Sequence, residues 1–254
     1  MYWDPAEYGR FDDERSRPFF DLVGRIAATN PRRVVDLGCG SGKLTVALAR
    51  RWPSALVQGI DSSAEMIAAC PQDGGVSFAV QDVAQWSMPV DTDVLISNAV
   101  LQWVPSHRAL LASWAATLPS GGWLGFQVPG NFDAPSHVLM RRLAATPKWE
   151  PRLAGVLRHH DAVASPQEYA TLLLDCGLQV DAWESTYLHL LPGADPVLRW
   201  LRGTGLRPVL AALAPDEAEN FQAEFGAALR SAYPPTPQGT FLPYRRVFVV
   251  AHKT

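Results

Sequence analysis

The sequence predicts an α/β fold in which a mostly parallel sheet is covered by helices on both faces. Short apolar, β-branched segments alternate with segments of helical periodicity through the first half of the chain. This alternation is typical of βαβ units, whose strands pair in parallel. A glycine-rich turn follows the first predicted strand, and acidic residues follow the second and the third. Because such sheets bind ligands beyond the carboxyl ends of their strands, we expect the functional site there.

The first half of the chain contains one leading helix and five strands. The helix is predicted over residues 12–28, where Phe19, Phe20, Val23 and Ile26 lie on one apolar stripe. Strands are predicted at residues 32–37, 55–60, 76–80, 93–97 and 123–128. Helices between them are predicted at residues 44–50, 63–69 and 106–118.

The second half of the chain has a different pattern. Residues 130–162 contain several prolines and are predicted to be irregular, followed by a helix at 166–175 and a strand at 178–188. Residues 193–232 are predicted to be wholly helical, with Phe221, Phe225 and Leu229 on one face. A last strand is predicted at 246–251. A helical insertion between two strands suggests a lid over the site, which we assign to residues 193–236.

Composition indicates a globular, cytoplasmic-type protein. Its 254 residues include 22 Lys and Arg against 25 Asp and Glu, a formal charge of −3, and 48% are hydrophobic. This balance disfavours a general nucleic-acid partner, because phosphate binding requires clustered basic residues. No apolar run approaches the roughly 20 residues of a membrane helix, and the first residues lack the pattern of a secretory signal. We therefore expect no membrane partner.

Cysteine and histidine spacing predicts neither a disulfide framework nor a metal site. Cys39, Cys70 and Cys176 are widely separated. His159 and His160 are adjacent, but they lie in a polar stretch that is more typical of a solvated loop than of a pair of metal ligands.

The glycine-rich turn is the most informative motif. Gly38, Gly40 and Gly42 follow Asp36 with the spacing GxGxG, whereas dinucleotide binding requires GxGxxG. A carboxylate beside the turn disfavours a pyrophosphate and favours a ligand with a free ammonium group. S-adenosylmethionine has such a group, a ribose with two hydroxyls and an adenine, and it has no phosphate.

Further acidic and polar residues at strand ends fit the same ligand. Asp61 ends the second strand, where it can accept hydrogen bonds from both ribose hydroxyls, and Asp82 follows the third, where it can accept one from the adenine amino group. Each feature also has a purely structural explanation: the glycines form a tight turn, Asp61 caps a helix and Asp82 is an acid in a loop. Together, these three separate explanations account for the pattern less well than one bound ligand does. The other predicted cofactor-binding residues are Ser62, Val83, Asn98 and Gln102.

The motifs resemble those of the class I S-adenosylmethionine-dependent methyltransferases over residues 33–129. This resemblance implies a Rossmann-like sheet of seven strands, with the seventh antiparallel beside the fifth. A narrower resemblance, to the trans-aconitate 2-methyltransferases within this class, covers nearly the whole chain. It is carried by residues 3–8, 14–18, 59–63, 98–104, 204–208 and 245–251.

The resemblance implies one methyltransferase domain over residues 1–254. Its parts are a helical lead at 1–30, a cofactor-binding half at 33–129, the rest of the sheet at 130–192 and 245–254, and the lid. The implied reaction moves a methyl group from the sulfonium to a carboxylate oxygen of trans-aconitate. Carboxylates are already ionised at neutral pH, so no general base and no catalytic side chain is expected. Catalysis then depends on alignment and exclusion of water.

Residues that bind a polycarboxylate substrate are predicted by residue type and place in the chain. Arginine binds carboxylates bidentately, although arginines on an amphipathic helix are usually solvated. Trp103, Tyr187 and His189 follow or end strands near the expected site, although core packing is the commoner role of such rings. The predicted substrate-binding residues are Arg15, Arg17, Trp103, Tyr187, His189, Arg207 and Arg246.

Four alternatives differ in acceptor or in class. A methyltransferase of another small carboxylic acid or small metabolite would differ only in the lid. A nucleic-acid methyltransferase is disfavoured by charge and by residues 98–101, and Cys39 inside the glycine turn is not a placed thiolate. An NAD(P) oxidoreductase would require the missing glycine spacing. The fourth alternative is a module that binds the cofactor without turnover. The sequence does not indicate the oligomeric state.

Overall fold

The computed structural model describes residues 12–72, 75–158 and 162–254, with the side chains of 12–15 excepted. The chain forms two compact units. The first comprises Met1–Pro129, Val163–Ser185 and Arg246–Thr254, and the second comprises Gly130–Ala162 and Thr186–Arg245. No helix in the described part of the chain is both long and apolar enough to cross a membrane.

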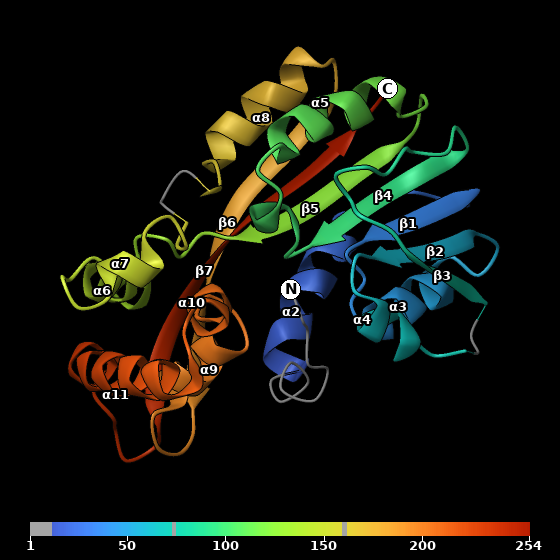
Figure 1. Ribbon diagram of the computed structural model, residues 1–254. Coiled ribbons are helices and arrows are strands. Elements are labelled where there is room, and N and C mark those ends of the chain that lie inside the picture. Colours follow the sequence, from blue (N-terminus) through green and yellow to red (C-terminus); the bar gives the residue numbers. More distant parts are fainter. Residues whose placement is uncertain (1–11, 73–74, 159–161) are drawn as a thin grey trace. The chain divides into compact units, whose positions relative to one another are not determined.

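Seven strands form one sheet in the order β3-β2-β1-β4-β5-β7-β6 (Figure 1). They are β1 (Arg33–Leu37), β2 (Leu56–Asp61), β3 (Val76–Val80), β4 (Thr92–Asn98), β5 (Trp123–Pro129), β6 (Gln179–Leu191) and β7 (Thr240–His252). The pairs β1–β2, β2–β3, β1–β4 and β4–β5 are parallel, and β7 is antiparallel to β5. The predicted seven-stranded, mostly parallel sheet is confirmed.

The strand order reverses between β1 and β4, which pair in parallel side by side. To one side of this point the order runs to β2 and β3, and to the other side it runs to β5. The connections on the two sides therefore diverge and leave a crevice at the carboxyl ends of β1 and β4. The predicted glycine turn and the residues after β4 both lie there.

Helices cover both faces of the sheet, as predicted. In Figure 1, α5 (His107–Thr117) and α8 (Pro166–Asp175) lie on one face. On the other, α2 (Asp12–Gly24) packs against β5, while α3 (Lys43–Arg51) and α4 (Ala64–Ala68) pack against β2 and β3. The short 3-10 helix η1 (Leu101–Trp103) follows β4. A capping box between Ser165 and Glu168 fixes the start of α8.

The alternation of β1 assigns its side chains to the two faces. Val35 and Leu37 are fully buried in the core beneath α5 and α8, together with Trp114 and Tyr169. Asp36 therefore points to the opposite face, toward α3.

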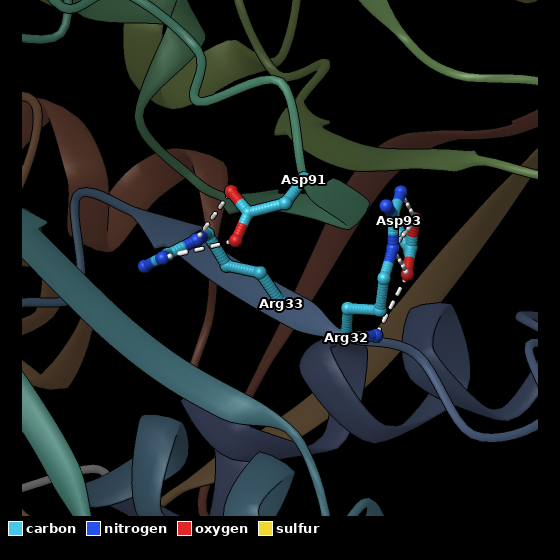
Figure 2. A network of polar contacts seen from close by, with 4 residues as sticks. All are labelled: Arg32, Arg33, Asp91 and Asp93. Atoms are coloured by element: carbon cyan, nitrogen blue, oxygen red, sulfur yellow. Dashed lines mark hydrogen bonds and ion pairs between the residues drawn. The ribbon is translucent and has the colours of Figure 1, made fainter.

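Two ion pairs hold the amino-terminal ends of β1 and β4 together (Figure 2). Arg32 Nη2 lies 2.7 Å from Asp93 Oδ1, and the Arg32 backbone amide also donates to Asp93 Oδ2 at 2.7 Å. Arg33 Nε lies 2.9 Å from Asp91 Oδ1. The guanidinium groups hold the pKa of both aspartates below the ordinary carboxyl value. Because these pairs are partly exposed, we expect each to contribute little to the stability of the fold.

The second unit corrects two predictions. Residues 130–162, predicted to be irregular, contain α6 (Pro135–Ala144) and α7 (Glu150–Leu153). Their prolines stand in the first helical turn, where no backbone donor is lost, rather than between helices. The segment predicted as wholly helical divides into α9 (Pro196–Arg202), α10 (Arg207–Ala212) and α11 (Pro215–Ala232). Pro208 and Pro215 again stand in first turns, so each marks a new helix.

The apolar face of α11 is part of the core of the second unit. Phe221 and Phe225 are fully buried and Leu229 nearly so, which confirms the predicted stripe. The Trp149 ring packs edge-on against Phe221, with ring centroids 5.3 Å apart. Trp149 Nε1 also donates to Glu224 of the same helix at 3.1 Å, so this buried indole has its polar atom satisfied.

Candidate active site

A cavity of about 480 Å³ opens at the carboxyl ends of the first unit's parallel strands. This volume falls in the usual range of small-molecule sites. The predicted residues that line it are Gly38, Gly40, Asp61, Ser62, Asp82, Val83, Asn98 and Trp103. They come from the ends of four strands, so the structure brings together groups that are far apart in the sequence. The site therefore lies at the crevice that the strand order predicts.

The glycine turn needs glycine for two separate reasons. Gly38, Gly40 and Gly42 all have positive φ angles, of 74°, 56° and 72°. A Cβ on Gly38 would also lie 2.1 Å from Val100 Cγ2, because the turn after β1 and the loop after β4 approach closely. Around Gly40 there is open space within 4 Å, on the cavity side of the turn. The turn thus combines a left-handed backbone with a surface that a ligand can approach.

Asp61 connects the glycine turn to the start of α4. Its Oδ2 accepts from the Gly40 backbone amide and its Oδ1 from the Ser63 backbone amide, both at 2.9 Å. A carboxylate has about four acceptor positions, so each oxygen retains one for a ligand. Asp61 is therefore held rigidly at the cavity wall with acceptor capacity left for a pair of hydroxyls.

The turn after β3 presents Asp82 and Val83 to the cavity. Asp82 Oδ1 accepts from the Ala84 backbone amide at 2.9 Å, which fixes the carboxylate, and Val83 is buried. The second oxygen, Oδ2, can accept from a ligand amino group. Asp82 thus offers an acceptor for the edge of a heterocycle, and Val83 offers an apolar surface for its face.

Asp36 lies behind the glycine turn and does not line the cavity. It is 2% exposed, and its Oδ2 accepts from the Thr45 hydroxyl of α3 at 2.7 Å. Burial raises the pKa of this carboxyl to about 6, against the opposing effect of the Thr45 hydrogen bond. Asp36 was predicted to contact an ammonium group of the ligand, but its carboxyl group is buried beneath the glycine turn and does not reach the cavity. Gly42 and Gln102 are also behind the wall, and Gln102 Nε2 donates to the Ala99 carbonyl at 2.6 Å.

We expect the substitution Asp36→Asn to stabilise the ligand-free protein at neutral pH and not at pH 4. The folded state holds the Asp36 proton up to about pH 6, whereas the unfolded chain loses it near pH 4. Ionisation therefore costs stability as the pH rises from about 4 to 6, by roughly 3 kcal/mol. Urea unfolding of both proteins at pH 4 and pH 7 measures the difference between them. A difference that stays constant across this range would contradict the raised pKa.

Cys39 lines the cavity in an environment that disfavours its thiolate. Burial raises the pKa of its thiol far above the ordinary value, with Asp36 and Asp61 adding to the effect. Its Sγ faces the Gly40 carbonyl oxygen at 3.6 Å. The prediction that Cys39 provides no placed thiolate agrees with this environment.

Asn98 joins a hydrogen-bonded row across three strands. Gln127 of β5 donates from Nε2 to Asn98 Oδ1 at 2.7 Å, and Arg246 of β7 donates from Nη1 to Gln127 Oε1 at 3.0 Å. Gln127 and Arg246 are buried, whereas Asn98 lines the cavity. Arg246, predicted to bind substrate, is instead part of this buried row. No sequence signal marks Gln127, because the row depends on how distant strands pair.

The other predicted substrate residues are distributed over both units. Arg17 is exposed on α2 and does not line the cavity, and the Arg15 side chain lies outside the described residues. In the second unit, Arg207 is half-buried at the first position of α10. Tyr187 and His189 project from the same side of β6, as predicted, with nearly parallel rings.

Tyr187 and His189 belong to a buried aromatic cluster of the second unit. They are 8% and 4% exposed, and the His189 ring lies 4.7 Å from Trp200 between centroids. Tyr244 lies 5.5 Å from Trp200 and closes the cluster. The structure therefore supports core packing for these two residues, in place of the predicted position at the mouth of a site.

Several lining residues were not predicted. Ser16 and Phe20 reach the cavity from α2, although the sequence pattern assigned Phe20 to a core stripe. Phe20 is in fact 51% exposed, because it stands one position away from the buried Phe19. The sequence did contain a signal for Phe20: two adjacent large apolar residues on a helix cannot both face the same core. The remaining unpredicted lining residues are Cys39, Ser41, Lys43, Leu44, Met66, Ala99, Val100 and Val104.

These residues fit S-adenosylmethionine. Asp61 retains acceptor positions for two ribose hydroxyls, and Asp82 with Val83 offers an acceptor and an apolar wall for an adenine. The open surface at Gly40 admits a ligand close to the backbone. Ala99, a non-glycine residue with a φ of 59°, adds backbone strain directly after β4, as functional sites often do.

Comparisons with known proteins identify the family. Residues 11–182 match the family model of a methyltransferase domain. The chain is 52% identical to trans-aconitate 2-methyltransferase of Streptomyces avermitilis over 99% of this chain and 97% of that protein. It is also 52% identical to the protein of the same name from Rhodococcus jostii, over 98% of each.

A solved structure shares the fold. It is phosphoethanolamine N-methyltransferase 2 of Haemonchus contortus, in complex with S-adenosyl-L-methionine. The TM-score is 0.55 at 14% identity, over 94% of this chain and 53% of that one. The sheet, the cavity and the full-length relatives agree: the chain belongs to the S-adenosylmethionine-dependent methyltransferases, within the trans-aconitate 2-methyltransferase family.

Proposed function

We propose that the chain transfers the methyl group of S-adenosylmethionine to a carboxylate oxygen of trans-aconitate. The products are the monomethyl ester and S-adenosylhomocysteine. The observation that carries the proposal is the identity of about half of all residues, over nearly the whole chain, with proteins named for this reaction. The cavity at the carboxyl ends of β1–β4 supplies the cofactor site that the reaction requires.

The reaction needs no general base on the protein. A carboxylate with an ordinary pKa near 4 is already ionised at neutral pH. Its negative charge meets the positive sulfonium, so charge is lost as the transition state forms. Strong fixed charges at the reacting atoms would therefore stabilise the reactants more than the transition state. Position and desolvation remain as the contributions that the protein makes.

The first unit supplies the cofactor contacts. Bound S-adenosylmethionine supplies an activated methyl group on sulfur. Asp61 would bind the ribose hydroxyls, Asp82 would accept from the adenine amino group, and Val83 would pack beside the ring. Gly38, Gly40 and Ser62 would form the wall for the rest of the cofactor, and Asp36 would act from below the turn through its charge.

Apolar side chains exclude water from the same cavity. Phe20, Met66, Val100, Trp103 and Val104 line it. An apolar wall weakens the hydration of a carboxylate nucleophile and makes attack on the methyl group easier. Trp103, directly before Val104 in the loop after β4, is the predicted substrate residue that lines this wall.

The second unit and the leading helix supply the candidate cations for the acid. Arg15, Arg17 and Arg207 remain our proposals for holding the carboxylates that are not methylated, and residues 193–236 for a lid. Arginine forks suit this task because they bind a carboxylate bidentately. The proposed partner is thus a small polycarboxylate, with no nucleic acid and no membrane, and the proposed location is the cytoplasm.

An activity panel tests the proposed acceptor. Purified protein and S-adenosylmethionine are offered trans-aconitate, cis-aconitate, citrate, isocitrate and a fatty acid, and release of S-adenosylhomocysteine is followed. We expect kcat/KM for trans-aconitate to exceed that for each other acid by at least about tenfold. The other tricarboxylates arrange their three carboxylates differently and the fatty acid has only one, so each leaves a cation of the site unpaired.

Other outcomes of the panel separate the alternatives. Preferred turnover of another acid would overturn trans-aconitate as the acceptor and leave the cofactor site intact. Cofactor binding without turnover of any acid would favour a module that binds the cofactor for another purpose. The variant Asp93→Asn, at the opposite end of the sheet from the cavity, is the control for general effects of substitution.

A further inference from the structure

The row of Asn98, Gln127 and Arg246 has a direction that its chemistry determines. A guanidinium has only donors, so the Gln127 amide must turn its oxygen, Oε1, toward Arg246 Nη1. The Gln127 nitrogen, Nε2, then faces Asn98 and donates to it at 2.7 Å. Asn98 must therefore turn its oxygen toward Gln127. The orientation of both amides follows from the single guanidinium at the end of the row.

The sheet register explains why the three side chains meet. Asn98 of β4 pairs directly with Gln127 of β5 in the parallel ladder. Gln127 pairs with Phe248 of β7, so Arg246, two positions earlier, projects from the same face as a diagonal neighbour. All three residues lie in the first unit, at the carboxyl ends of β4 and β5.

The burial of the row makes its direction rigid. Gln127 is fully buried and Arg246 is 5% exposed, so water does not compete for their hydrogen bonds. Asn98 is the member that lines the cavity. Oδ1 is turned toward Gln127, so the group that Asn98 directs away from Gln127 is the Nδ2 amide, which only donates.

We infer that Arg246, acting through Gln127, orients Asn98 so that its amide donates to a carboxylate oxygen of a ligand in the cavity. Arg246 and Gln127 are positioning residues, and Asn98 is the binding residue. The inference deepens the proposed function, and it rests on it for the identity of the acid. Two carboxylates qualify chemically, that of the methionyl end of the cofactor and that of the acceptor. Both need a donor, and a reversed Asn98 would offer either one an oxygen instead.

The test reverses the orientation of the Asn98 amide with a substitution at Gln127. In Gln127→Glu both carboxylate oxygens accept, so the hydrogen bond from Arg246 is kept while Asn98 must turn its Nδ2 toward residue 127. Asn98 Oδ1 then faces the ligand carboxylate. We expect affinity to fall about 10- to 100-fold, the range for a hydrogen bond to a charged group that is replaced by an opposed acceptor. Calorimetric titration with S-adenosylhomocysteine gives the cofactor Kd, and steady-state kinetics give KM for trans-aconitate.

A double-mutant cycle separates positioning from a general structural effect. The variants are Gln127→Glu, Asn98→Ala and the two combined. If Gln127 acts through Asn98, then Gln127→Glu changes affinity less than about twofold once Asn98 is already alanine. Loss of the same size in both backgrounds would overturn the inference, as would unchanged Kd and KM in a folded Gln127→Glu protein. Thermal unfolding without ligand verifies that each variant is folded.

The two readouts identify which carboxylate binds. A weaker S-adenosylhomocysteine Kd with KM for the acid unchanged assigns Asn98 to the cofactor, and the converse assigns it to the acceptor; either result supports the inference. Calorimetry needs no turnover. A wild-type protein that binds S-adenosylhomocysteine but does not methylate trans-aconitate would thus overturn the proposed acceptor, while the calorimetric cycle still decides whether Gln127 orients Asn98 toward the cofactor.

Discussion

The substitution Asp61→Ala is expected to weaken binding of S-adenosylhomocysteine by about 10²- to 10⁴-fold. The proposed ribose contact consists of two hydrogen bonds from hydroxyls to a carboxylate, and its loss removes about 1.5–3 kcal/mol for each. The Gly40 and Ser63 amides also lose their acceptor, which leaves the backbone bonds from Gly38 and Cys39 to the Ile60 carbonyl to hold the glycine turn to the end of β2. Isothermal titration calorimetry measures the change, at a temperature where unfolding curves show the variant to be folded.

A second variant separates the loss of charge from the loss of shape. In Asp61→Asn one carboxylate oxygen becomes an amide nitrogen, which must face the Gly40 or the Ser63 backbone amide, donor against donor. We expect this isosteric variant to be impaired as well. The control is Asp93→Asn, which removes the fork with Arg32 at the amino end of the sheet and leaves the Kd unchanged. Near-native affinity in both Asp61 variants would contradict a ribose contact.

The substitution Gly38→Ala is expected to destabilise the protein by about 2–5 kcal/mol. The left-handed backbone at a φ of 74° costs an alanine roughly 1–2 kcal/mol. The new Cβ would also lie 2.1 Å from Val100 Cγ2, and relieving such an overlap costs about 1–3 kcal/mol more. Urea unfolding measures the total, and loss of cofactor binding should accompany it because the turn must shift.

Gly121 offers a matched control for the backbone contribution. Its φ is 80°, and a Cβ there would meet nothing within 4 Å, so Gly121→Ala reports the strain without the overlap. Adding Val100→Ala to Gly38→Ala should recover part of the difference, since it removes the two nearest methyl groups. Equal destabilisation by Gly38→Ala and Gly121→Ala would show that the overlap with Val100 is relieved without a loss of stability.

Local patterns in the sequence were sufficient to predict the parallel strands and several of the residues that line the cavity. These lining residues could be located because they stand at the ends of strands with clear apolar runs. They include those of the turn after β1 and the acids Asp61 and Asp82. These residues meet in space because parallel strands end at one edge of the sheet, which is a property of the fold class. Asp36 differs because it lies within β1 rather than after it, and alternation turns its side chain under the turn.

Other features depend on contacts between distant segments, which residue type does not reveal. The row from Asn98 to Arg246 needs the register of β5 against both β4 and β7. Phe20 lines the cavity only because α2 packs against β5. Prolines misled the prediction for residues 130–162: they indicated irregular structure, whereas Pro135 begins α6.

The environment of Cys39 protects the protein from its own reagent. A sulfonium methyl group is an alkylating agent, and a thiolate is the side chain that would compete best with the acid for it. Cys39 lines the same cavity, yet burial and the neighbouring carboxylates keep it protonated. Burial, with a smaller contribution from the carboxyl groups around the glycine turn, therefore favours methylation of the acceptor over S-methylation of Cys39.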